Sequence, residues 1–192
     1  MNRKNILGLT LGGMFAAMAF ICFSYLRIEI PMGLGLTGKI YLGHTFIILA
    51  ALILGVKYGA LSSALGLTIG DLLTGYTTSA PPTFLSKFLI GFIIAFIAHK
   101  LFHLSEETDD AKITKIVLIA SIVGSVAGVV LEPLIRFAFK FYILGLAYPI
   151  AYASAVNCAI SMSLGDLASI PLAFILYKIL RKSPLTKLQF NS

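Results

Sequence analysis

Residues 5–26 form a stretch of 22 residues without a charged side chain. A helix of roughly 20 apolar residues spans a bilayer, whereas the apolar region of a secretory signal peptide has about 7–15 residues. Arg3, Lys4 and the Ala17-Met18-Ala19 sequence resemble a signal peptide, but the length favours a first transmembrane helix. Only 12% of the residues are charged and 58% are hydrophobic, whereas a soluble domain has about 25% charged residues. We therefore expect an integral membrane protein.

The apolar runs predict an all-α domain over residues 1–192 with six transmembrane helices. The expected helices cover residues 6–26, 41–54, 58–73, 82–103, 116–139 and 155–180. Gly- and Pro-rich segments at 27–39, 74–83 and 142–152 are expected to be irregular, because proline removes a backbone donor. The polar run 105–115 is expected to be a cytoplasmic loop that divides the chain into two halves.

The distribution of Lys and Arg predicts that both termini lie in the cytoplasm. This orientation places ten basic residues inside and five outside, in agreement with the positive-inside rule. The inside set is Arg3, Lys4, Lys57, Lys100, Lys112, Lys115, Lys178, Arg181, Lys182 and Lys187, and the outside set is Arg27, Lys39, Lys87, Arg136 and Lys140. The three irregular segments then share the outer face, and irregular backbone is tolerated at membrane depth only where protein or a cavity satisfies it. We therefore expect an outward-facing pocket.

Asp71 and Lys87 flank the second irregular segment, so we expect them at a similar depth. An ionised side chain at mid-membrane costs roughly 2.5–3.5 kcal/mol on insertion scales and needs a reason. Two interpretations are open: a polar floor beneath a ligand, or an ion pair that joins two helices.

Further charged residues lie in the last two predicted helices. Glu132, Arg136 and Lys140 recur every four residues and share one helix face. They either pair near the outer interface or contact a ligand. Asp166 has no charged neighbour nearby in sequence, so it either finds a partner across the bundle or is protonated.

Polar and aromatic side chains cluster at the predicted outer helix ends. His44 and Asn157 each open a helix and either cap it or hydrogen-bond a ligand. The aromatic residues there either form an interfacial belt or stack on a flat ring. These aromatic residues are Tyr41, Tyr76, Phe84, Tyr148 and Tyr152.

Small residues concentrate in the first helix, at Gly12, Gly13, Ala16 and Ala17. Such spacing lets helices approach closely in lipid, either inside the bundle or against a partner. The sequence has no phosphate-binding loop, zinc helix or nucleophile elbow. Cys22 and Cys158 lack metal-ligand spacing, and His99 and His103 are expected at the membrane interface. We therefore expect no metal, no cofactor and no catalytic residue.

Four segments resemble the S component, the substrate-binding subunit, of an energy-coupling factor (ECF) vitamin transporter. They are Leu42-Gly-His-Thr-Phe46, Leu54-Gly-Val-Lys-Tyr-Gly59, Gly66-Leu-Thr-Ile-Gly-Asp-Leu-Leu-Thr-Gly-Tyr76 and Ala80-Pro-Pro-Thr-Phe-Leu-Ser-Lys87. The resemblance is to the group that includes riboflavin, pyridoxine and hydroxymethylpyrimidine S components. It implies six helices in a bacterial plasma membrane and a vitamin bound between outer loops and helix ends.

The resemblance also implies partners: a transmembrane coupling subunit and two cytoplasmic ATPases. Family members contact the coupling subunit through an Ala-x-x-x-Ala pattern in helix 1, which corresponds here to Gly13 and Ala17 or to Gly12 and Ala16. The thiamine-specific branch of the family resembles a Trp-containing site, whereas this chain has no Trp. We therefore favour a small pyridine or pyrimidine of the vitamin B6 type over thiamine. The alternatives are riboflavin or another vitamin and, in a different class, a small intramembrane enzyme that uses Asp71 or Asp166.

Together these interpretations define nine candidate substrate-binding residues. They are His44, Asp71, Tyr76, Thr83, Phe84, Lys87, Arg136, Tyr148 and Asn157. Thr83 is included because it belongs to the Ala-Pro-Pro-Thr-Phe sequence, part of one of the four segments that resemble S components.

Overall fold

A computed structural model describes residues 3–31 and 37–181. Its long helices are α1 (Arg3–Tyr25), α2 (Gly43–Leu73), α3 (Ala80–Ala95), α4 (Asp110–Ala138) and α5 (Tyr148–Arg181). Five helical stretches in this part of the chain are long and apolar enough to cross a membrane. The middle of the predicted 27–39 segment, and Lys182 and Lys187 of the orientation argument, lie outside the described residues. The number of crossings and the orientation of the termini stay predictions.

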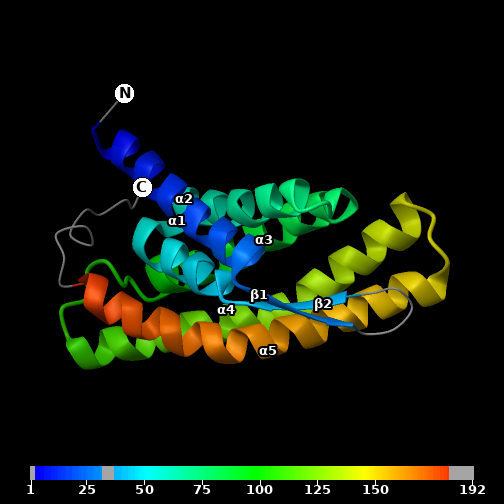
Figure 1. Ribbon diagram of the computed structural model, residues 1–192. Helices are drawn as coiled ribbons and strands as arrows, with labels where there is room; N and C mark the ends of the chain where they lie inside the picture. The colour runs from blue at the N-terminus through cyan, green and yellow to red at the C-terminus, as the bar shows by residue number, and fades with distance from the viewer. Residues whose placement is uncertain (1–2, 32–36, 182–192) are drawn as a thin grey trace.

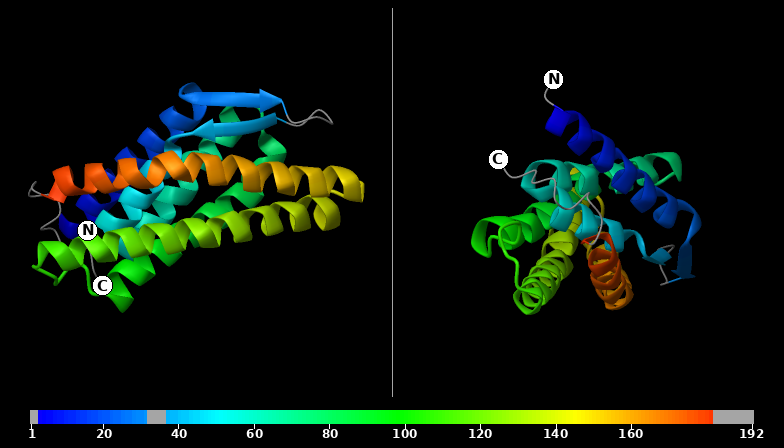
Figure 2. Two further views of the ribbon diagram at one scale, coloured as in Figure 1. Left: turned by 90° about the horizontal axis from the view of Figure 1, so that it is seen from below. Right: turned by 90° about the vertical axis from the view of Figure 1, so that its left-hand side faces the viewer.

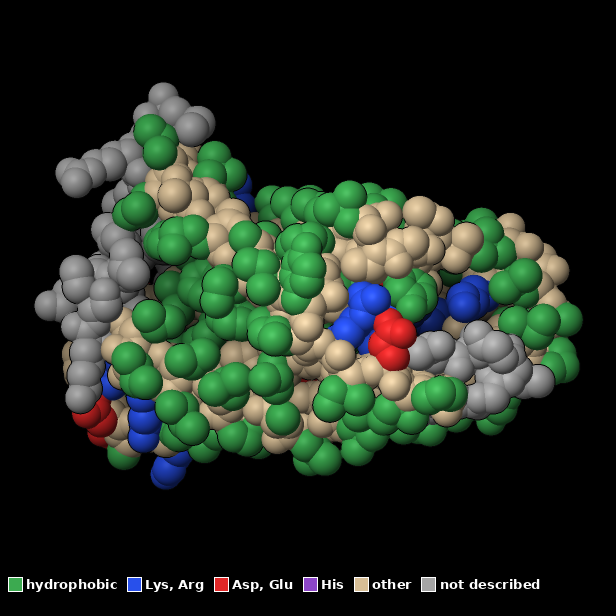
Figure 3. Space-filling view, in the orientation of Figure 1, with side chains coloured by type: hydrophobic (Ala, Val, Ile, Leu, Met, Phe, Trp, Pro, Cys, Tyr) green, Lys and Arg blue, Asp and Glu red, His purple; other side chains and the backbone are tan. Residues whose placement is uncertain are grey.

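The helices form an elongated bundle in which α4 and α5 lie side by side and antiparallel (Figures 1 and 2). This pair extends beyond the other helices at the end where α4 and α5 are joined. Hydrophobic side chains cover most of the face in Figure 3, and on that face charged side chains gather beside the β hairpin and at one end. An apolar exterior of this kind suits a lipid environment.

A sharp break at Gly55 folds α2 back on itself. Gly55 has φ 73° and ψ −166°, a backbone conformation essentially restricted to glycine. Residues 43–54 and 56–73 therefore pack against each other, and Ser63 Oγ lies 3.5 Å from the carbonyl oxygen of Ile47. A Cβ atom at Gly59 would lie 2.7 Å from the carbonyl oxygen of Ala50. Gly55 and Gly59, which lie at the junction of the predicted helices 41–54 and 58–73, thus supply the bend and the close approach.

His99 stabilises the end of the first half of α2. Its Nε2 atom lies 3.0 Å from the carbonyl oxygen of Leu52 and 3.3 Å from that of Ala51. These carbonyls have lost their helical partners because the helix ends at Gly55. The His99 side chain is buried within the protein, and its depth at the membrane interface stays a prediction.

The segment predicted as an irregular loop at 27–39 contains an antiparallel hairpin. Strand β1 (Arg27–Pro31) pairs with β2 (Thr37–Tyr41), and Glu29 lies opposite Lys39. The expectation of a purely α-helical chain is therefore wrong here. The alternation of polar and apolar residues in Arg27-Ile-Glu-Ile30 is the period-2 signal of a strand.

The expectation that residues 74–83 are irregular is wrong after Tyr76. A 3₁₀ turn (Thr77–Ser79) leads directly into α3, whose first turn contains Pro81 and Pro82. Proline is compatible with the first turn because the N–H groups there have no helical partner. The same helix continues into a π-helical turn (Phe96–Leu101).

Two other helices begin earlier than predicted. α4 begins at Asp110 rather than residue 116, because the Asp109 carboxylate accepts a hydrogen bond of 3.0 Å from the Ala111 N–H and caps the helix. It runs through Pro133 and ends in a π-helical turn (Phe139–Ile143). α5 begins at Tyr148 rather than residue 155. The predicted 105–115 and 142–152 segments are therefore shorter than expected.

Candidate functional site

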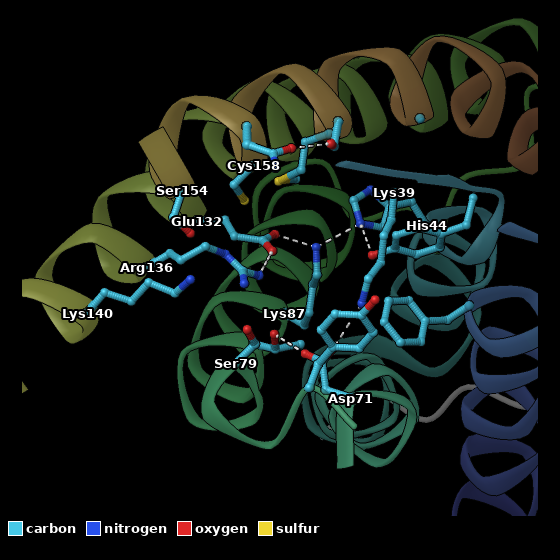
Figure 4. Close-up of a pocket in the computed structure, with 18 residues that line it drawn as sticks. Lys39, His44, Asp71, Ser79, Lys87, Glu132, Arg136, Lys140, Ser154 and Cys158 are labelled. Atoms are coloured by element: carbon cyan, nitrogen blue, oxygen red, sulfur yellow. Dashed lines mark hydrogen bonds and ion pairs between the residues drawn. The ribbon is translucent and has the colours of Figure 1, made fainter. Parts of the chain in front are cut away.

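A cavity of about 200 Å³ lies between helices α2 to α5, α1 and the β hairpin (Figure 4). Polar and charged side chains from all of these elements except α1 enter it. The lining residues are Phe23, Lys39, Tyr41, His44, Asp71, Tyr76, Ser79, Thr83, Lys87, Glu132, Arg136, Lys140, Ser154, Asn157, Cys158, Ser161, Met162 and Gly165.

Lys87 of α3 is the most deeply placed charge, with 1% of the residue exposed. Its ammonium donates to the Glu132 carboxylate of α4, and its Nζ lies 2.7 Å from Nε2 of His44. Arg136 contacts the other oxygen of Glu132 at 3.2 Å. A buried carboxylate thus lies between two cations (Figure 4), as the desolvation cost of an isolated ion requires.

His44 connects this group to α5. Its Nδ1 lies 2.6 Å from Oδ1 of Asp166. Because the Lys87 ammonium can only donate, Nε2 of His44 must accept, and Nδ1 then carries the proton that is donated to Asp166. Of the two possibilities predicted for Asp166, the structure shows a partner across the bundle.

Asp71 has other partners than predicted. Thr83 donates a hydrogen bond of 2.6 Å to Oδ2 of Asp71, and Lys39 Nζ lies 3.8 Å from Oδ1. The proposed ion pair between Asp71 and Lys87 is wrong, because Lys87 pairs with Glu132. Lys39 Nζ also lies 2.9 Å from the centroid of the Tyr76 ring, a cation–π arrangement.

Lys39, Tyr41 and Tyr76 lie outside the apolar spans, and their ionisation is perturbed. Burial lowers the pKa of Lys39 to about 8, although the Asp71 carboxylate favours the charged form. Burial raises the pKa of Tyr41 well above its usual value, and Glu132 adds to this effect. Burial and then Glu29 raise the pKa of Tyr76. Both tyrosines are therefore neutral donors at physiological pH, whereas the charge of Lys39 is sensitive to pH.

Of the nine candidate residues, seven line the cavity: His44, Asp71, Tyr76, Thr83, Lys87, Arg136 and Asn157. Phe84 and Tyr148 do not. Phe84 is rotated by about 100° from Thr83 around α3 and is exposed, where it stacks with Phe88. Tyr148 is also exposed and contacts Phe141 and Tyr152. Neither ring therefore lines the cavity, and a contact of either ring with a ligand stays a prediction.

Several lining residues were not among the candidates. On α5, Ser154, Cys158, Ser161 and Gly165 share one face with Asn157. Their spacing of three to four residues is the helical period, so this polar and small face could have been found from sequence. Lys39 could not, because its position depends on the unpredicted hairpin.

The small residues of α1 divide into two faces. Ser62 Oγ of α2 donates a hydrogen bond of 2.8 Å to the Gly12 carbonyl, and a Cβ at Gly66 would meet the Ala16 backbone. Gly12 and Ala16 therefore pack against α2 inside the molecule, and their role in a partner interface stays a prediction. Gly13 and Ala17 are exposed, and among the described residues no atom outside the neighbouring turns of α1 lies within 4 Å of a Cβ built on Gly13.

Comparisons with known proteins give one family and three solved structures of similar fold. The model of the family described as "ECF-type riboflavin transporter, S component" matches residues 3–182. A crystal structure of an S component for biotin from an ECF-type ABC transporter is 19% identical and covers 100% of this chain and 99% of its own, with a TM-score of 0.64. A structure of ThiT from Listeria monocytogenes is 19% identical, with 96% and 99% covered and a TM-score of 0.60.

A third structure, described as the S component of a bacterial ECF transporter, is 13% identical. It covers 93% of this chain and 97% of its own, with a TM-score of 0.57. At these identities the structures establish a shared fold. No protein in the curated set of sequences matches the chain.

Proposed function

Because the chain belongs to the ECF-type riboflavin transporter S component family, we propose that it captures a small pyridine or pyrimidine of the vitamin B6 type in the cavity between α2 and α5. Members of this family are multi-pass membrane proteins that bind a vitamin and work with a transmembrane coupling subunit and ATPase subunits. They are transport subunits, so the alternative of an intramembrane enzyme is set aside.

The observation that carries the proposal is the size of the polar cavity. Its volume of about 200 Å³ is below the roughly 300–1,000 Å³ of sites for drug-sized ligands. This favours a single ring over a larger fused-ring vitamin. Riboflavin, which gives the family its name, remains the second candidate.

The side chains around the cavity suit a flat ring with polar substituents. Tyr76 and Phe23 supply aromatic surface for stacking. Asn157 and Thr83 supply amide and hydroxyl groups that can bond ring substituents. The four residues come from four different elements, so a ring bound between them would contact most of the bundle at once.

The exposed face of α1 around Gly13 and Ala17 is proposed as the contact with the coupling subunit. Both positions are exposed, and small residues allow a second helix to approach closely in lipid. Gly12 and Ala16 pack against α2, so they are covered by this helix. Gly13 and Ala17 then form the small-residue face of α1 that a second protein can reach.

Binding to the purified subunit tests the proposal. The protein is purified in detergent without coupling subunits, and native mass spectrometry is run against pyridoxine, pyridoxal, hydroxymethylpyrimidine, thiamine, riboflavin and biotin. We expect one-to-one retention of a single-ring compound and its confirmation by calorimetric titration. Retention of riboflavin alone would replace the B6-type substrate. Retention of no vitamin would contradict substrate capture in this cavity.

A further inference from the structure

Basic side chains outnumber acidic ones in the lining of the cavity. The basic residues are Lys39, Lys87, Arg136 and Lys140, and the acidic residues are Asp71 and Glu132. Asp166 lies behind His44 and brings a third carboxylate. One positive charge still has no counterpart, and an uncompensated charge is costly in a membrane bundle.

The unbalanced charge lies at the α4 side of the cavity. Lys87 and Arg136 share Glu132, and Lys39 faces Asp71. Lys140, by contrast, is half-buried and forms no ion pair with any acidic residue in the described part of the chain. One turn away, Nε of Arg136 is buried and has no hydrogen-bond partner among the described residues. Both side chains extend from α4 toward the cavity (Figure 4).

We infer that the ligand carries an ionised oxygen, a carboxylate or an ionised ring hydroxyl, that binds between Arg136 and Lys140. This inference rests on the proposed function and specifies the chemistry of its substrate. The anion would accept hydrogen bonds from Lys140 and from the free donor of Arg136, and charge-assisted bonds of this kind are about twice as strong as neutral ones. It would also neutralise the excess positive charge. The ring itself would lie toward Tyr76 and Asn157.

A lipid phosphate is the other anion that could reach a lysine near a helix end, because lysine side chains extend toward headgroups. The two sources differ in what they predict. A vitamin anion makes affinity depend on the ionisable group of the vitamin itself. If the site instead binds a lipid phosphate, added anionic lipid would occupy it, and the preference of the protein for the ionised form of a compound would disappear.

The test uses pairs of compounds that differ only in the ionisable oxygen. They are pyridoxine and its 3-O-methyl ether, nicotinate and nicotinamide, and biotin and biotinamide. Each is titrated calorimetrically into the parent subunit in detergent, and into Lys140→Met and Lys115→Met variants. Lys115 is the matched control because it lies on the same helix but is exposed far from the cavity. Thermal melts establish that each variant is folded.

We expect the tightest ligand to be an ionisable member, with its blocked partner bound about tenfold or more weakly. The affinity ratio between the ionisable compound and its blocked partner should largely disappear in Lys140→Met and should be preserved in Lys115→Met. Transfer of the parent subunit into nanodiscs with phosphatidylglycerol should leave this ratio unchanged. Equal affinity within a pair, an unchanged ratio in Lys140→Met, or loss of the ratio in nanodiscs would overturn the anion site. In those cases vitamin binding itself, and thus the proposed function, would stand. Failure of every compound and of the wider vitamin panel to bind would overturn both.

Discussion

His44 and Asp166 are joined by a hydrogen bond of 2.6 Å between Nδ1 and Oδ1, although 122 residues separate them in the sequence. The bond fixes the start of α2 against the middle of α5 and sets the tautomer of the imidazole. It also orients Nε2 toward Lys87, at 2.7 Å. One neutral histidine therefore joins three helices beneath the cavity.

Breaking this bond should destabilise the protein without disturbing its surface. We expect Asp166→Leu to lower the free energy of unfolding by about 1–3 kcal/mol, because a buried N–H loses its acceptor. His44→Leu/Asp166→Leu should lose less than the sum of the single changes, since partners in one network couple. Denaturant unfolding in micelles measures both. Asp110→Leu, which removes only an exposed contact with Arg181, should cost at most about 1 kcal/mol. Strict additivity would contradict the coupling.

The second prediction concerns Lys87 and Glu132. Lys87→Met leaves a buried carboxylate with Arg136 as its remaining cation, and we expect a loss of about 3–5 kcal/mol in unfolding free energy. Lys87→Met/Glu132→Gln should recover at least half of this, because the amide is neutral and still accepts a bond from Arg136. Lys87→Met/Asp71→Leu should show no recovery, since Asp71 is paired with Thr83 and Lys39. Recovery by Asp71→Leu instead would mean that the pairing is assigned incorrectly.

A third prediction concerns the exposed face of α1. We expect Ala17→Leu to abolish co-purification with the coupling subunit and to leave vitamin binding to the isolated subunit unchanged, because Ala17 is exposed. Ala168→Leu adds the same bulk at an exposed site on α5 and should preserve the complex. Ala16→Leu should instead lower thermal stability, since Ala16 packs against Gly66. Intact complexes with Ala17→Leu would place the interface elsewhere.

The fourth prediction uses the low pKa of Lys39, about 8. Between this value and the usual value near 10.5, the unfolded chain binds a proton that the folded protein has lost. The contribution of Lys39 to the unfolding free energy therefore rises with pH across this window, by at most about 1.4 kcal/mol per pH unit. We expect the melting temperature of the parent, relative to Lys39→Met, to be constant below pH 7 and to increase from pH 8 to 10. A decrease would contradict the burial of this amine.

The fifth prediction is topological. In a background with Cys22→Ala and Cys158→Ala, Thr78→Cys should react with an impermeant reagent from outside the cell and Thr108→Cys only after permeabilisation. Both positions are exposed in the structure. The orientation follows from the excess of basic residues on one side. Labelling of both positions from the same side would contradict the six-span layout.

Sequence predicted the apolar helices and seven of the eighteen residues that line the cavity, because these depend on local periodicity and on the cost of charge in lipid. Thr83 and Lys87, four residues apart, share one face of α3, and Phe84 lies on another. The pairing of Lys87 with Glu132 depends on how α3 and α4 are rotated against each other. Nothing in the local sequence specifies that rotation, so the nearer Asp71 was the wrong partner.

Helix ends and the hairpin were predicted less well for local reasons. Asp109 caps α4, so the polar run that was predicted as a loop contains the start of a helix. The Pro-Pro pair lies in the first turn of α3 and begins this helix instead of interrupting it. The bend at Gly55 falls between the predicted helices 41–54 and 58–73. The contact of His99 with the freed carbonyls depends on the tertiary structure.

The ion pair between Lys87 and Glu132 crosses the polar connection around residues 102–109, which separates the first three long helices from the last two. Each part alone would lose the partner of a buried group: Lys87 of the first fragment would lose Glu132, and Asp166 of the second would lose His44, whereas Glu132 would keep Arg136. We therefore expect neither fragment to fold stably in the membrane when it is expressed alone. Since α3 is synthesised before α4, Lys87 gains its buried counter-ion only when the fourth long helix joins the bundle.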